Sequence, residues 1–203
     1  MMNWKFCPHC GAALVPKMEG GRERPVCTRC AYVAYGRFSV GVGGLLVHDK
    51  RVLLVQRNHD PGKGRWTLPG GYVEEDEPPE TALEREVREE TGLRVRSTGI
   101  LTVRHTSAKD GQNVYIVFGM ELAGSLDQLR PDGDGVETAH VGLYRLAEFD
   151  ALGEMGLISR WVAERYQPGD AALLRAAPEL EQRLRYSGAW VALFAACPNA
   201  GAE

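Results

Sequence analysis

Four of the five cysteines lie in two short pairs, and this spacing constrains the fold more than any other feature of the chain. Sixteen residues separate the first pair, Cys7 and Cys10, from the second pair, Cys27 and Cys30. A gap of two residues lets both thiolates of a pair reach one metal ion from a tight turn. Two such turns complete a tetrahedral site that suits structural Zn²⁺. We therefore predict that these four cysteines bind one structural Zn²⁺ ion.

Two disulfides in a secreted protein would be an alternative explanation of the same spacing. The odd fifth cysteine, Cys197, and an N-terminus without a basic region and apolar run argue against it. His9 lies within the first pair and could replace one cysteine as a ligand, but we expect it to be a turn residue. Residues 1–35 are too few to bury a core, so the metal would supply most of their stability. This module resembles a zinc ribbon.

Length and composition exclude several classes of protein. The 203 residues provide room for one full-size domain and one small domain. Hydrophobic residues make up 44% of the chain, as in an ordinary globular protein, and no apolar stretch of about 18 residues could span a membrane. The net charge of −3 argues against a strongly basic nucleic-acid surface, although residues 1–35 carry five basic and two acidic side chains. Reduced cysteines and the lack of a targeting signal indicate a cytoplasmic protein.

Residues 74–90 form an acidic segment with nine acidic side chains and two arginines, a local sum of −7. Prolines at 78 and 79 suit the first turn of a helix, and Gly92 suits its C-terminal end. Three glutamates spaced three and four residues apart would share one face of this helix: Glu86, Glu89 and Glu90. Carboxylates at this density suit Mg²⁺ or Mn²⁺, and we predict that they hold such a cation. An acidic helix facing solvent is the alternative interpretation.

The same segment resembles the Nudix box. That box reads Gly, five residues, Glu, seven residues, then Arg-Glu-aliphatic-X-Glu-Glu-X-Gly-aliphatic. Every constrained position matches: Gly71, Glu77, Arg85, Glu86, Val87, Glu89, Glu90, Gly92 and Leu93. With average residue usage, the chance of such a match in a chain of this length is about 10⁻⁸. We therefore set aside the solvated helix as an explanation of this segment.

The resemblance implies an α/β fold, a Nudix α/β/α sandwich with a mixed sheet, preceded by the small zinc ribbon. We expect three parts: a zinc ribbon at 1–35, a Nudix hydrolase domain at 36–170, and a C-terminal extension at 171–203 that packs on it. Hydrophobic patterning predicts the elements within these parts. Strands are expected at 38–47, 51–57, 95–105, 114–122 and 141–146, helices at 157–166 and 179–185, and either a strand or a helix at 189–197.

The resemblance also assigns roles to residues of the box. Glu86 and Glu90 would be the principal metal ligands, and Glu89 a further ligand or the base that activates water. The carbonyl oxygen of Gly70 often joins the metal shell in the family. Arg85 would support the loop–helix–loop together with Glu77.

Candidates outside the box are fewer. Some Nudix enzymes use a glutamate on a late loop as base or extra ligand. Glu137 occupies a Gly-rich loop that suits this role. The alternative is that Glu137 is an ordinary exposed acid. Three arginines are candidate phosphate contacts: Arg57, Arg65 and Arg104. Three aromatic residues could stack on a base or flavin, although core packing is the simpler explanation: Trp66, Tyr72 and Tyr115.

The substrate is less constrained. A zinc ribbon before a Nudix domain resembles the NADH pyrophosphatases, but their Ser-Gln-Pro-Trp-type motif is absent, as is the proline that marks ADP-ribose pyrophosphatases. We expect metal-dependent hydrolysis of a diphosphate such as ADP-ribose, FAD or NADH, giving a nucleoside monophosphate and a phosphorylated product. One alternative is a ribbon that binds nucleic acid, with hydrolysis at RNA 5′ ends. Another is a non-catalytic ligand sensor. The family resemblance also implies a homodimer.

Overall fold

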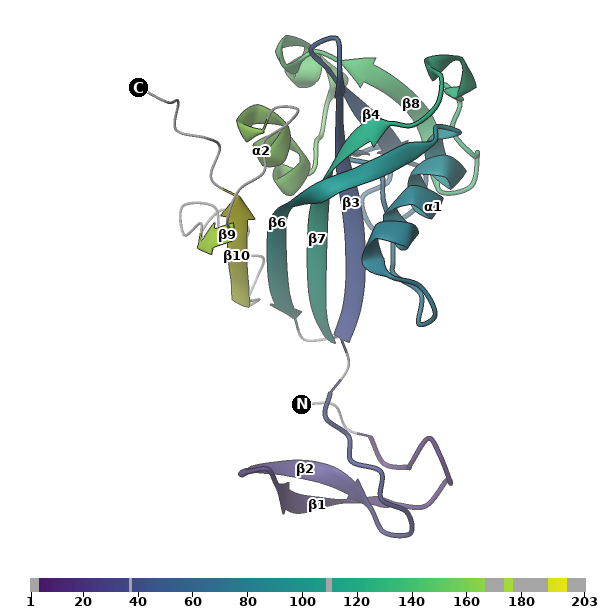
Figure 1. Cartoon of the computed structure of the whole chain (residues 1–203). Coiled ribbons are helices and arrows are strands. Elements are labelled where there is room, and N and C mark those ends of the chain that lie inside the picture. Colours follow the sequence, from purple (N-terminus) through teal and green to yellow (C-terminus); the bar gives the residue numbers. More distant parts are fainter. Residues whose placement is uncertain (1–3, 37, 109–110, 167–173, 177–189, 197–203) are drawn as a thin grey trace. The chain divides into compact units, whose positions relative to one another are not determined.

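The structure is a computed structural model, and it describes residues 4–36, 38–108, 111–166, 174–176 and 190–196 (Figure 1). The chain forms two compact units, Met1–Phe38 and Ser39–Glu203. Within the described residues, no helix is both long enough and apolar enough to cross a membrane.

The first unit is built on one β-hairpin. Strand β1 (Leu14–Glu19) pairs antiparallel with β2 (Arg22–Cys27), and a Gly-Gly turn at positive φ joins them. Glycine adopts this backbone conformation without a steric penalty, which explains the sharp reversal. The pairing places Leu14, where β1 begins, opposite Cys27, where β2 ends. Both cysteine pairs therefore lie at the same end of the hairpin.

The second unit contains an eight-stranded sheet with the order β5-β4-β3-β7-β6-β10-β9, in which β8 also pairs with β4. The hairpin of β3 and β4 turns at Asp49 and Lys50, which both have positive φ and lie between the strands predicted at 38–47 and 51–57. The strands are β3 (Phe38–His48), β4 (Arg51–Arg57), β5 (Trp66–Thr67), β6 (Val95–Ala108), β7 (Gly111–Leu122), β8 (Thr138–Tyr144), β9 (Leu174–Ala176) and β10 (Trp190–Ala196).

Most neighbouring strands run antiparallel, but β3 and β7 run in the same direction. Near the start of both strands, the side chain of Asn113 donates to the Ser39 carbonyl oxygen. Near their ends, a Cβ atom at Gly44 would overlap with the side chain of Met120. Contacts therefore advance along both strands together, and the sheet is mixed, as expected from the family resemblance.

Each face of the sheet carries its own hydrophobic core because side chains alternate along a strand. In β4, Val52 and Leu54 belong to the core under α2 (Leu157–Arg165), whereas Leu53 and Val55 belong to the core under α1 (Pro79–Thr91). The two helices thus cover opposite faces, which gives the predicted α/β/α sandwich (Figure 1). Two short 3₁₀ helices complete the described elements, η1 (Leu126–Gln128) and η2 (Leu146–Leu152).

Two expectations need correction or completion. The strand predicted at 141–146 begins earlier, at Thr138, and ends at Tyr144, because the chain turns into η2 at Leu146. The apolar segment at 189–197, for which strand and helix were both open, is a strand: β10 pairs antiparallel with β6. The helix predicted at 179–185 lies outside the described residues.

Candidate active site and zinc ribbon

The four cysteine sulfur atoms of the first unit converge, and their ligand atoms all lie within 4.8 Å of one another. The Sγ–Sγ distances are 3.6 Å for Cys7 and Cys30, 3.5 Å for Cys10 and Cys27, and 3.7 Å for Cys10 and Cys30. Tetrahedral Zn²⁺ with Zn–S bonds of about 2.3 Å would require sulfur atoms about 3.8 Å apart. The observed sulfur cluster therefore fits a Zn²⁺ ion with no open coordination position.

Backbone hydrogen bonds favour the thiolate form of Cys27, whereas at Cys30 the neighbouring sulfur atoms and burial outweigh the Tyr32 N–H and raise the pKa to about 12. The N–H groups of Arg29 and Cys30 each donate to the Cys27 sulfur at 3.3 Å, and these bonds lower the pKa of Cys27 to about 6. A thiolate is the form that binds a metal. His9 is not part of the cluster, and its ring packs against Tyr32 with ring centroids 5.0 Å apart.

Helix α1 of the second unit buries two of its glutamates. Leu83 and Val87 form its apolar stripe and are fully buried. Glu86 and Glu90 flank that stripe and are only 9% and 7% exposed, whereas Glu89 faces solvent. Burying a carboxylate is costly without a counter-charge or hydrogen bonds, so this helix face needs partners.

Arg85 supplies one counter-charge for several acids. Its Nη2 and Nε atoms donate to Glu77 at 2.6 and 3.1 Å, and its Nη1 atom donates to Glu86 at 2.9 Å and Glu89 at 3.2 Å. Nη2 also donates to the Tyr72 carbonyl oxygen. The hydrogen bonds to Arg85 lower the pKa of Glu77. One guanidinium thus connects the loop before the helix to two of the three helix glutamates.

Glu90 lacks such a cation. Its carboxylate accepts the Gly70 N–H at 2.8 Å and the Thr138 hydroxyl at 3.2 Å. Burial nevertheless raises the pKa of Glu90 to about 8, and burial also raises the pKa of Glu86. A cation bound between these carboxylates would reverse this effect because it favours the charged form.

Two glycines allow the approach of the loop to the helix. A Cβ atom at Gly71 would overlap with the Glu86 carboxylate, and one at Gly70 would overlap with the Val42 carbonyl oxygen. Gly70 also has φ +147°, which side chains rarely allow. Buried oxygen donors around a space that admits no side chain suit a small hard cation such as Mg²⁺ or Mn²⁺.

Glu137 lies on a loop that is fixed by residues the sequence analysis did not identify. One carboxylate oxygen of Asp134 accepts the N–H groups of Val136 at 3.0 Å, Glu137 at 3.0 Å and Thr138 at 2.9 Å. Asn58 binds the same loop, because its N–H donates to the Glu137 carbonyl oxygen at 2.7 Å. The only signal in the sequence was that turns favour Asp-Gly, which does not identify the groups that the carboxylate binds.

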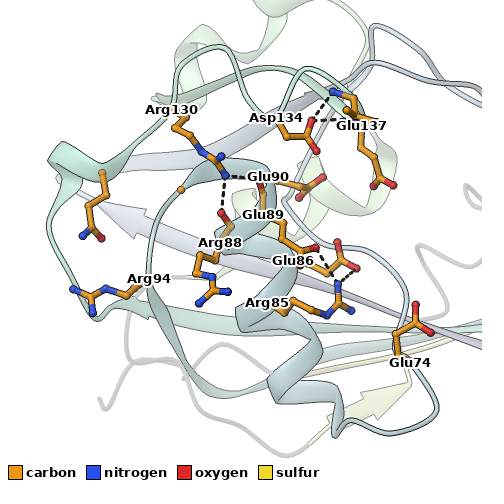
Figure 2. Close-up of a pocket in the computed structure, with 13 residues that line it drawn as sticks. Glu74, Arg85, Glu86, Arg88, Glu89, Glu90, Arg94, Arg130, Asp134 and Glu137 are labelled. Atoms are coloured by element: carbon orange, nitrogen blue, oxygen red, sulfur yellow. Dashed lines mark hydrogen bonds and ion pairs between the residues drawn. The ribbon is translucent and has the colours of Figure 1, made fainter.

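A pocket of about 1000 Å³ joins these elements (Figure 2). Glu86, Glu89, Glu90 and Glu137 line one part of it, so the structure brings together the predicted box glutamates and the predicted late glutamate. Other lining residues come from the C-terminal end of α1 and the segments that follow, and the sequence analysis did not single them out: Arg88, Arg94, Gln128 and Arg130.

The three predicted phosphate-contacting arginines do not line this pocket. Arg65 forms an ion pair with Glu154, and the Arg57 Nε atom donates to the Pro61 carbonyl oxygen. Arg104 donates to Asn113 at 3.0 Å and lies 5.0 Å from the centre of the Tyr115 ring.

The aromatic candidates differ in exposure. Trp66 is a core residue whose ring packs edge-on against Tyr144. Burial raises the pKa of Tyr115 to about 12, and its ring fills the space beside two glycines of β3. Tyr72 is 63% exposed and directly follows the Gly70-Gly71 turn. Of the three, Tyr72 is the most exposed, whereas Tyr115 is half-buried and Trp66 is buried.

Comparison with known proteins agrees with this geometry. The model of the NUDIX domain matches residues 37–165, and the model described as Nudix N-terminal, a zinc ribbon, matches residues 5–36. An ADP-ribose pyrophosphatase from Methanocaldococcus jannaschii is 35% identical over 117 residues, which cover 57% of this chain and 68% of that protein.

Two further similarities extend over more of the chain. The NAD-capped RNA hydrolase NudC from Photobacterium profundum is 28% identical over 159 residues, which cover 76% of this chain and 55% of that protein. A crystal structure of a NUDIX hydrolase from Nitrosomonas europaea covers 80% of this chain and 90% of its own, with a TM-score of 0.67 and 28% identity. The chain therefore belongs to the Nudix family of pyrophosphohydrolases and carries the N-terminal zinc ribbon found in that family.

Proposed function

We propose that this chain hydrolyses the diphosphate bond of a nucleoside diphosphate linked to another moiety, with ADP-ribose as the favoured substrate. The single observation that carries this proposal is the burial of Glu86 and Glu90 on one face of α1, against a loop of two glycines. Arg85 pairs with Glu86 but not with Glu90, so the two buried carboxylates are only partly compensated, and a divalent cation would supply the missing positive charge.

The proposed ligands of this cation are Glu86, Glu90 and the carbonyl oxygen of Gly70, with Glu89 as a further ligand or base. Mg²⁺ or Mn²⁺ at this place would neutralise phosphate oxygens and lower the pKa of a bound water. Arg85 holds Glu86 and Glu89 in place through its Nη1 atom. Thr138 and the Gly70 N–H fix the two oxygens of Glu90.

The chain's own residues then carry the proton transfer. A water molecule gives its proton to the carboxylate of Glu89, and the resulting hydroxide attacks one phosphorus atom of the diphosphate in line. The bond from that phosphorus to the bridging oxygen breaks, and the leaving phosphate keeps the electron pair. Glu137 is the second candidate base because its loop lines the same pocket and Asp134 fixes the loop. Arg57 and Arg104 remain our candidates for phosphate contacts, whereas Arg65 is already paired with Glu154.

The relatives support an adenosine-containing substrate without choosing one. The protein from Methanocaldococcus jannaschii is named an ADP-ribose pyrophosphatase, and the one from Photobacterium profundum an NAD-capped RNA hydrolase. Hydrolysis of an NAD-capped RNA is therefore our second candidate. It is favoured by the match to NudC, which extends over 76% of this chain.

Hydrolysis of a substrate panel tests the proposal. The panel contains ADP-ribose, FAD, NADH, an NTP and NAD-capped RNA, each with Mg²⁺ and with Mn²⁺. We expect one compound to turn over far faster than the others, and Glu90→Gln to lower kcat/KM at least about 100-fold, equivalent to about 2.7 kcal/mol. Exposed Glu80→Gln, in the first turn of α1, is the matched control. If a compound binds but none is hydrolysed, the chain is a ligand sensor and the proposal is wrong.

A further inference from the structure

The active-site pocket has two ends of opposite charge (Figure 2). The box glutamates and Glu137 form the acidic end, described above. The other end, which we call the arginine end, is lined by Arg88, Arg94 and Arg130. Arg88 and Arg94 also line a neighbouring cavity of about 420 Å³. The roles that the Nudix box residues have in the family explain the acidic end but not the arginine end.

Arg130 has a structural explanation. Its guanidinium donates to the carbonyl oxygens of Arg88, at 2.8 Å, and Glu89, and its own N–H donates to the Thr91 carbonyl oxygen at 2.8 Å. Arg130 therefore donates to three carbonyl groups at the C-terminal end of α1, of which that of Arg88 also accepts the N–H of Gly92.

Arg88 and Arg94 have no such explanation. Both are exposed, and neither takes part in an ion pair with another described residue. The acid one helical turn before Arg88 is Glu84, and its carboxylate instead accepts the N–H of Ser97 at 3.3 Å. The C-terminal end of a helix carries a partial charge of only about −0.5, so three guanidinium groups leave a net positive charge there.

We propose that Arg88 and Arg94 favour substrates with a phosphate group outside the hydrolysed diphosphate, which ADP-ribose lacks, and that they bind this phosphate. This inference rests on the proposed function, because the acidic end with its cation takes the diphosphate. Guanidinium groups suit phosphate because their forked donors match its oxygen atoms. A pocket of about 1000 Å³ is at the upper limit of ordinary small-molecule sites, so it has room for a dinucleotide with one additional phosphate.

The additional phosphate could come from two sources with the same chemistry. It could be a phosphate monoester on a ribose of a free dinucleotide, or the first phosphodiester of an RNA chain attached to the nucleotide. Both place a phosphate beyond the diphosphate, and both would be contacted by the same two side chains.

The first test compares substrates with and without this phosphate: NADPH against NADH, which differ in the phosphate alone, and NAD-capped RNA against NAD, which differ in the attached RNA chain. We expect wild type to favour the phosphate-bearing member of at least one pair by about tenfold or more in kcat/KM. Arg88→Gln/Arg94→Gln should lower this preference at least tenfold. Arg96→Gln is the control, because Arg96 lines only the neighbouring cavity and pairs with Glu121 at 3.8 Å. The pair that responds identifies the source.

The second test measures binding without turnover. Calorimetry with Mg²⁺ compares AMP with adenosine 3′,5′-bisphosphate, adenosine 2′,5′-bisphosphate and the dinucleotide pApA, none of which contains a diphosphate to be hydrolysed. We expect wild type to bind at least one of the last three ligands at least fivefold tighter than AMP. The double variant should bind that ligand and AMP with equal affinity. If wild type hydrolyses none of the compounds in the substrate panel, the proposed function fails, and this binding difference still decides the inference. Equal binding of all four ligands by wild type would overturn the role of the arginines.

Discussion

The zinc ribbon and the active-site pocket both gather negatively charged ligands, but they compensate that charge differently. In the ribbon, four sulfur atoms converge within 4.8 Å, and a metal ion at their centre would be the counter-charge. Among the described residues, no three carboxylates bring their oxygen atoms together in this way. In the pocket, Arg85 compensates Glu77, Glu86 and Glu89, and Glu90 is left with hydrogen bonds alone.

This difference separates a structural site from one that can react. The sulfur cluster has no open position, and the described residues of the small unit form no hydrophobic core that could hold it together without a metal. The pocket belongs to a unit with two hydrophobic cores, so its fold does not depend on a cation. The negative charge of its glutamates can therefore remain partly uncompensated, and the glutamates can remain accessible to a substrate. The following predictions test this contrast, from the largest expected effect to the smallest.

Removal of one zinc ligand should unfold the ribbon and leave the second unit folded. Binding of structural Zn²⁺ contributes roughly 10–16 kcal/mol to the folding of small zinc modules, and few other interactions could replace it here. In Cys27→Ser we expect loss of bound zinc by elemental analysis and loss of dispersed NMR signals from residues 4–36, with the thermal midpoint of the second unit unchanged. Cys197→Ser, outside both pairs, should retain one zinc per chain. A folded ribbon in Cys27→Ser would contradict the metal-centred explanation.

Removal of the shared guanidinium should destabilise the second unit. Arg85→Ala leaves buried Glu86 and half-buried Glu77 without their cation, and we expect a loss of about 2–4 kcal/mol in the free energy of unfolding. Urea denaturation followed by tryptophan fluorescence measures this change. Arg85→Lys keeps the charge but not the forked donor, so its loss should be smaller. Equal stability of Arg85→Ala and wild type would show that the network contributes nothing.

The stability of the second unit should depend on pH when the protein carries zinc but no Mg²⁺ or Mn²⁺. Folding raises the pKa of Glu90 from 4.5 to about 8, so between these values the folded state binds more protons than the unfolded state. Stability should therefore fall as pH rises through this window, by about 1–3 kcal/mol.

Urea midpoints at pH 5 and pH 8 measure this dependence. In Glu90→Gln the slope should be smaller because the titrating group is absent, and in wild type Mg²⁺ should reduce it because a cation favours the charged form. An identical slope in wild type and Glu90→Gln would assign the dependence to another group.

Release of the Glu137 loop should have the smallest effect. Asp134→Ala removes the oxygen that accepts three backbone N–H groups, and we expect kcat to fall about tenfold, or about 1.4 kcal/mol. Asp134→Asn keeps an acceptor at the same place and should recover most of the activity. Glu137→Gln should reproduce the loss if Glu137 acts on the proton. Full activity of Asp134→Ala would remove the loop from the mechanism.

Local patterns predicted much of the fold. The strands expected at 38–47 and 51–57 form the hairpin of β3 and β4, and α1 ends at Gly92, which has φ +80°. These features depend on residues close in the sequence, where turn and helix-end preferences act directly. The end of β8 was misplaced because η2 starts at Leu146, and an apolar residue there resembles a continuing strand.

Contacts between distant residues could not be predicted in the same way. Glu90 meets Thr138 across 48 positions, and Arg65 pairs with Glu154 across 89. Arg65 was a candidate phosphate contact, and only the folded chain reveals that an acid already pairs with it. The arginine end is a similar case, because Arg88, Arg94 and Arg130 come together only where the helix ends against later segments.

The sequence by itself determined the chemical groups: four thiolates at a spacing that suits Zn²⁺, and glutamates that recur on one helix face beside an arginine. Such features follow from the fixed geometry of turns and helices, so residue identity and spacing are sufficient. The tertiary structure alone decided which glutamates are buried, which loop reaches them and where the arginines lie. Burial and long-range contacts result from the packing of two cores against one sheet, and no local spacing encodes them.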